Sequence, residues 1–144
     1  MKQFAFLLIV SIICAKPNLL LAQRNIESVS ITLNTTNDDK DFDTFIRFQL
    51  QSADGSWIAT NEGRFGGTFP EGSTYTFPLK LGNSHYPEKL LLNTFLYAYI
   101  NPVGNDTWSF TWQLVVNLDD GTRMVANGQG GLSESRNSFK LRAF

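Results

Sequence analysis

The sequence is very poor in cysteine and histidine, and each shortage excludes a class of chemistry. Among 144 residues there is one cysteine, Cys14, and one histidine, His85. Cys14 lies in an apolar stretch near the N-terminus that we interpret below as a cleaved signal. Without it the chain has no disulfide, no catalytic thiol and no cysteine-containing zinc site. We therefore expect the core, or a bound metal, to stabilise the protein.

The single histidine also argues against the common hydrolytic sites. A zinc site of the His-Glu-x-x-His kind needs a second histidine, and the segment 71–75 lacks the second glycine of a nucleophile elbow. A pair of glycosidase carboxylates is formally possible, but nothing singles out one pair among thirteen acids. We predict that the protein is not an enzyme, with no catalytic residues and no organic cofactor.

Neither sign of charge is in excess. Twelve Lys and Arg stand against thirteen Asp and Glu, a formal net charge of −1, so no basic surplus favours a nucleic-acid partner. Hydrophobic residues make up 42% and charged residues 17%, which is typical of a globular chain. The length favours one domain.

Residues 1–22 have the layout of a secretory signal peptide. Lys2 precedes an apolar run from Phe4 to Cys14, and a small residue, Ala22, stands at the expected cleavage point. Lys16 and Pro17 interrupt the run after about eleven residues, whereas a membrane-spanning helix needs about twenty. Cleavage would leave residues 23–144 as a secreted domain, periplasmic or extracellular, without a transmembrane segment and with a formal net charge of −3.

After the signal, apolar residues alternate with polar ones in short runs, which is typical of half-buried strands. We predict eight strands: 26–34, 44–52, 56–60, 74–81, 92–100, 108–118, 122–127 and 138–144. Asp-Gly pairs at 54–55 and 120–121 predict antiparallel hairpins, and the segments 63–72 and 128–137 are expected to be loops. The fold class is all-β, an antiparallel eight-stranded β-sandwich, with a barrel as the alternative. Charged residues in the last strand are typical of a sheet edge and favour a monomer.

Aromatic residues have two possible roles in such a domain. Exposed aromatic faces could stack on sugars, or the rings could fill a core that has no disulfides. Trp108, Phe110 and Trp112 share one face of their strand by spacing, so we expect them to be buried together. Trp57, beside a hairpin turn, is expected to be exposed.

The segment 37–43, Asn-Asp-Asp-Lys-Asp-Phe-Asp, is the clearest chemical feature. It contains four acids, Asp38, Asp39, Asp41 and Asp43. Neighbouring carboxylates repel each other unless solvent or a cation screens them, and calcium prefers six to eight oxygen ligands. The spacing does not fit an EF-hand, because Thr44 and Leu50 stand where glycine and glutamate would be needed. A calcium site and a merely solvated acidic turn are both consistent with these residues.

A calcium ion would need further oxygen ligands from a neighbouring loop. Asp119 and Asp120 are already explained as hairpin residues, whereas Asp106 lies in a longer loop that leads into a strand. Asp106 is therefore the better partner for the acidic segment.

The order of these segments resembles a PLAT domain, also called the lipoxygenase-homology domain, an eight-stranded β-sandwich of lipases, lipoxygenases and secreted toxins. The likeness rests on the strand 29–35 before the acidic turn, on Asp43-Thr44 leading into the strand 45–50, on the segment 71–79, and on 101–108 followed by a strand and Asp120-Gly121. The resemblance implies that Asp43 and Asp106 bind calcium, with Asp38, Asp39 and Asp41 completing the site. Asn101 and Thr74 or Tyr75 depart from the family's usual acids.

Two function hypotheses follow. The first is a secreted, non-catalytic binding module, with calcium ordering the acidic loop and with a lipid, protein or glycan partner. If the partner is a membrane, the best candidates for exposed apolar residues at loop tips are Phe65, Phe69 and Tyr86. The second is a structural or adhesive surface protein without a metal site.

Overall fold

The computed structural model describes residues 23–61 and 67–144. The predicted signal peptide, residues 1–22, lies outside the described residues, and so does the part of the 63–72 loop before Gly67. The described chain forms nine strands and a 3-10 helix, η1 (Glu88–Leu91). The strands are β1 (Asn25–Asn37), β2 (Phe45–Gln51), β3 (Trp57–Thr60), β4 (Thr74–Leu81), β5 (Tyr86–Pro87), β6 (Phe95–Asn101), β7 (Thr107–Leu118), β8 (Arg123–Ser133) and β9 (Ser138–Arg142). No helix in this part of the chain has the length and apolar character needed to cross a membrane.

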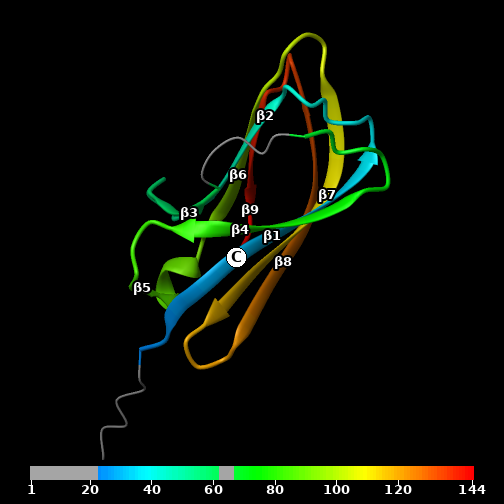
Figure 1. The fold of residues 1–144 in the computed structure, drawn as a ribbon. Helices are drawn as coiled ribbons and strands as arrows, with labels where there is room; N and C mark the ends of the chain where they lie inside the picture. The colour runs from blue at the N-terminus through cyan, green and yellow to red at the C-terminus, as the bar shows by residue number, and fades with distance from the viewer. Residues whose placement is uncertain (1–22, 62–66) are drawn as a thin grey trace, which may run out of the picture.

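All described strand pairs are antiparallel, and eight strands follow one path in the order β8-β7-β1-β4-β3-β2-β6-β9. The short β5 pairs with the start of β1. A ladder of two residue pairs, Ala59 with Leu81 and Thr60 with Lys80, joins the β8-β7-β1-β4 half to the β3-β2-β6-β9 half. The expected all-β, antiparallel eight-stranded architecture is therefore confirmed, with β5 as a small addition (Figure 1).

The core lies between the two halves. Phe48 of β2 meets Phe110 of β7 edge to face, with ring centroids 6.1 Å apart, although the two strands are not hydrogen-bonded neighbours. Trp108, Phe110 and Trp112 are buried, as their spacing predicts, and Trp57 is 45% exposed. Large aromatic rings thus supply much of the buried apolar surface that stabilises this fold.

Two buried hydrogen-bonding side chains complete this core. The Trp108 indole N–H donates to Thr35 Oγ1 over 3.1 Å. Where β3 ends, Asn61 continues the pairing with β2 through its side chain: Oδ1 accepts from the Phe48 N–H at 2.5 Å, and Nδ2 donates to the Ile46 carbonyl at 2.9 Å. Asn61 is only 5% exposed, so these partners are not replaced by water.

The prediction of a loop at 128–137 is wrong for its first half, because β8 continues to Ser133. Glycines made this segment look like a loop, but they are needed beneath aromatic rings. A side chain at Gly128 would collide with the Trp112 ring, and one at Gly130 would come within 2.5 Å of Phe139. The strand predicted from residue 92 likewise begins later, at Phe95, after η1 and a turn.

Candidate functional site

The acidic loop, residues 38–44, joins β1 to β2, and Lys40 lies at its centre. The Lys40 side chain is completely buried. Its ammonium donates to the backbone carbonyls of Asp41 at 2.6 Å and Thr44 at 2.8 Å, and it lies 5.0 Å from the centroid of the Phe69 ring. Lys40 and Phe69 also exchange two backbone hydrogen bonds, so the lysine is held at both ends.

Asp106, from the loop between β6 and β7, brings a carboxylate to the same place. Burial lowers the pKa of Lys40, and the negative charges of Asp106, Asp41 and Asp43 act in the opposite direction. Asp106 is 4% exposed, and its Oδ2 is buried without a hydrogen-bond partner among the described residues. We call the acidic loop together with Asp106 the acidic end.

The other predicted ligands have local roles. Asp39 Oδ1 accepts the Glu71 N–H at 2.5 Å and so ties the acidic loop to the segment before β4. Asp38 has a left-handed backbone, with φ of 56°, and accepts a long bond of 3.4 Å from the Asn37 amide. Asp41 and Asp43 are exposed.

These positions decide how well a metal ion would fit. The described residues contain no group of three or more acidic, histidine or cysteine side chains that could hold one. The cation close to Asp41, Asp43 and Asp106 is instead the Lys40 ammonium. With Lys40 in this position, the donor set does not fit calcium. The role of Lys40 was not predicted from the sequence, although a single lysine among four acids is a visible signal.

Two apolar side chains are exposed at the same end of the molecule. Phe42, in the acidic loop, is 74% exposed, and Val103, in the loop after β6, is 55% exposed. Their loops are neighbours, because Phe45 at the start of β2 pairs with Asn101 at the end of β6. Asp43 and Val103 line one shallow hollow, and in Figure 1 both loops lie at the top of the molecule.

The exposed apolar loop residues expected from the sequence are not Phe42 and Val103. Phe69 is buried, with 4% exposure, because its ring packs on Trp108 and Tyr75 and covers the Lys40 ammonium. Tyr86 is half-buried, and Phe65 lies outside the described residues. Hydropathy alone could not distinguish an apolar residue in a loop that folds inward from one that projects outward.

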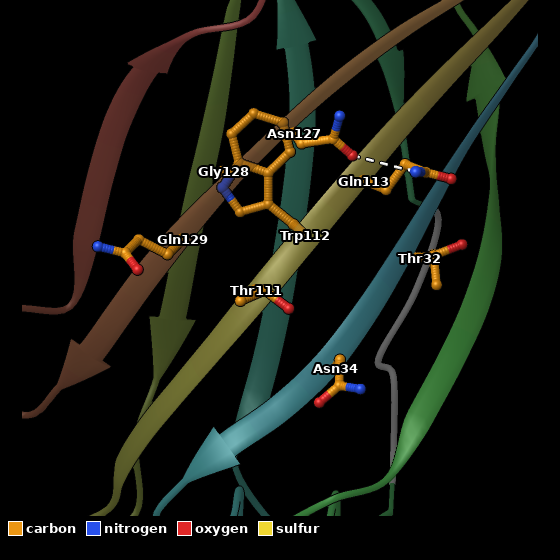
Figure 2. Close-up of a pocket in the computed structure, with 8 residues that line it drawn as sticks. All are labelled: Thr32, Asn34, Thr111, Trp112, Gln113, Asn127, Gly128 and Gln129. Carbon is orange, nitrogen blue, oxygen red and sulfur yellow. Dashed lines mark hydrogen bonds between the residues drawn. The ribbon is translucent and has the colours of Figure 1, made fainter.

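A second surface lies on the outer side of the β8-β7-β1-β4 half (Figure 2). A shallow hollow of about 510 Å³ is lined there by uncharged residues, which we call the uncharged face: Thr32, Asn34, Thr111, Trp112, Gln113, Asn127, Gly128 and Gln129. Cross-strand hydrogen bonds hold several of these side chains, such as the 3.0 Å bond from Gln113 Nε2 to Asn127 Oδ1. Thr32 and Asn34 bond likewise to Thr76 and Thr74 of β4.

His85 belongs to neither surface. Its ring lies 2.8 Å from the Ser84 hydroxyl, and its backbone N–H donates to Asn83 Oδ1 at 3.2 Å. These contacts with sequence neighbours are those of a turn residue.

No family model matches the sequence, and no curated protein matches it. Among solved structures, the alpha toxin from Clostridium absonum matches with a TM-score of 0.61 and 16% sequence identity. The match covers 83% of this chain but 32% of the toxin, and the matching part is the toxin's C-terminal β-sandwich. The chain has a PLAT-like β-sandwich fold. The fold implied by the resemblance is confirmed, and at this identity the likeness concerns the fold alone.

Proposed function

We propose that the protein is an exported, non-catalytic binding module that docks on a lipid surface through Phe42 and Val103. The observation that carries this proposal is the exposure of two apolar side chains on neighbouring loops at one end of a PLAT-like sandwich. The paired strands β2 and β6 anchor both loops at the same end of the sheet, so the two side chains are presented together.

The expected affinity is modest. Full burial of a large apolar side chain stabilises binding by about 1.5–3 kcal/mol, so two partly inserted side chains supply only a few kcal/mol. Asp41 and Asp43 stand beside Phe42 and would be repelled by anionic headgroups. Uncharged, zwitterionic lipids are therefore the better surface for the protein without a metal.

Calcium binding, which would require the Lys40 side chain to leave its buried position, is the finer part of this proposal. Asp38, Asp39, Asp41, Asp43 and Asp106 are the proposed ligands, and a bound ion would reduce the local negative charge and so weaken the repulsion of anionic lipids. The buried, unpartnered Asp106 Oδ2 supports a cation at this end. The Lys40 ammonium opposes it, because a like charge already lies beside these carboxylates.

Vesicle co-sedimentation tests the docking proposal. Residues 23–144 are mixed with phosphatidylcholine vesicles in chelator, and Phe42→Ser/Val103→Ser is compared with Leu92→Ser. Leu92 is 72% exposed but precedes β6, whereas Val103 follows it, so it lies at the other end of the strand. We expect the double variant to lose binding and Leu92→Ser to retain it. Binding that survives the double substitution, or equal loss in both variants, would refute docking by this end.

The uncharged face favours a second candidate, a neutral glycan. Amide and hydroxyl groups both donate and accept hydrogen bonds, as sugar hydroxyls do, and the hollow contains no charged lining residue. Cross-strand bonds already hold Gln113 and Asn127, which lowers the entropy lost on binding. A neutral-glycan array would test this candidate: signal that Thr111→Ala/Gln129→Ala abolishes supports it, and an array without signal removes it.

A further inference from the structure

We infer that Lys40 is a tethered cation that takes the place of a metal ion at the acidic end, so that calcium binds there only when the lysine side chain is displaced. This inference rests on the calcium part of the proposed function and is independent of the docking by Phe42 and Val103. The Lys40 ammonium would then compete with calcium for the oxygen atoms of the acidic end.

The oxygen atoms around the ammonium are of the kinds that calcium selects. Calcium is bound by backbone carbonyls and carboxylates. Lys40 Nζ already takes the carbonyls of Asp41 and Thr44, at 2.6 and 2.8 Å, and the charges that act on it are those of Asp106, Asp41 and Asp43. The ammonium therefore bonds to carbonyls that a calcium ion could use, and it lies in the field of the carboxylates that would complete such a site.

The environment also holds the lysine firmly. The side chain is completely buried, the ammonium faces the Phe69 ring, and the backbone bonds to Phe69 fix its stem. Asp106 Oδ2 has no hydrogen-bond donor among the described residues, so its buried charge depends on a nearby cation. Removing the ammonium would leave this carboxylate uncompensated.

Both cations cannot occupy the site together. A divalent ion bound to the Asp41 and Thr44 carbonyls would lie within a few ångströms of the ammonium, where like charges repel strongly at low dielectric. The apparent affinity for calcium is then reduced by the small fraction of molecules in which Lys40 has left its position. A lysine variant without the charge should bind calcium more tightly than the natural protein.

Thermal unfolding of residues 23–144 tests this competition, in chelator and in graded calcium, with magnesium as the ionic control. Lys40→Met keeps the length of the side chain and removes the charge, and Lys40→Gln is the polar alternative. We expect calcium to shift the natural protein by less than about 1 °C. It should raise the melting temperature of at least one variant by about 5 °C or more at a hundredfold excess over Kd. Lys40→Met/Asp106→Asn is the matched control and should lose the rise.

The outcomes separate the two proposals. A rise of equal size in the natural protein and the Lys40 variants would overturn the competition while keeping calcium. No rise in any variant would overturn both the competition and the calcium ligands. Vesicle binding in chelator depends on Phe42 and Val103, so it reports on docking whatever the calcium result. A Lys40→Met chain that folds only in calcium, and not in magnesium, would support the inference.

Discussion

Replacing Asn61 by alanine should be among the most destabilising single substitutions in the described part of the protein. Its side chain makes both hydrogen bonds that a neighbouring strand would otherwise give to β2 at Phe48 and Ile46. Alanine would leave a buried N–H and a buried carbonyl without partners. Each unsatisfied buried group costs about 1–3 kcal/mol, so we expect a loss of about 2–5 kcal/mol in the free energy of unfolding.

Urea unfolding of residues 23–144, followed by tryptophan fluorescence, measures this loss. The midpoint should fall while the slope stays the same, because the surface exposed on unfolding hardly changes. Asn34→Ala is the control: Asn34 is exposed, and among the described residues its side chain bonds to Thr74 alone, so the substitution should cost no more than about 0.5 kcal/mol. Equal effects of the two substitutions would refute the reasoning that Asn61 replaces a strand.

Two further predictions concern stability. Gly128→Ala should lower the free energy of unfolding, measured in urea, by about 1–3 kcal/mol, because the added methyl group would collide with the Trp112 ring. Gly131→Ala is the control and should be nearly neutral, because its methyl group would meet only ordinary van der Waals contacts. Similar losses at both sites would contradict the packing argument. Hydrogen bonds from Ser52, Asn25 and Thr122 hold the pKa values of Asp54, Asp119 and Asp120, respectively, below the ordinary 3.8. Their contribution to stability is therefore complete above that pH and is lost as the pH falls through the lowered values, so acid unfolding of Asp54→Asn should depend less steeply on pH than that of the natural protein.

The fold was largely predictable because strand signals are local. Alternation in the segment 74–81 predicts β4 with its bounds, and the Asp-Gly pairs predict the hairpins β2–β3 and β7–β8. The extension of β8 was not predictable, since the reason for Gly128 is an indole ring on another strand.

The candidate site was less predictable, because its features depend on contacts between loops. The acidic loop and Asp106 were found from their acidic residues. That Lys40 turns inward beneath Phe69 while Phe42 projects outward depends on the pairing of residues 40 and 69, which no local pattern contains. A lysine in an acidic run ordinarily belongs to the solvated surface.

The central place of β1 has a consequence for how the chain folds. Val29 of this first strand lies opposite Leu79 on one side and Val116 on the other, so both its partners come much later in the chain. Such non-local pairing makes all-β domains slow to fold, on the order of milliseconds to seconds. Until β7 has formed, β1 has an unpaired strand edge that other chains could join. Truncation before residue 107 should therefore produce aggregates rather than a smaller domain.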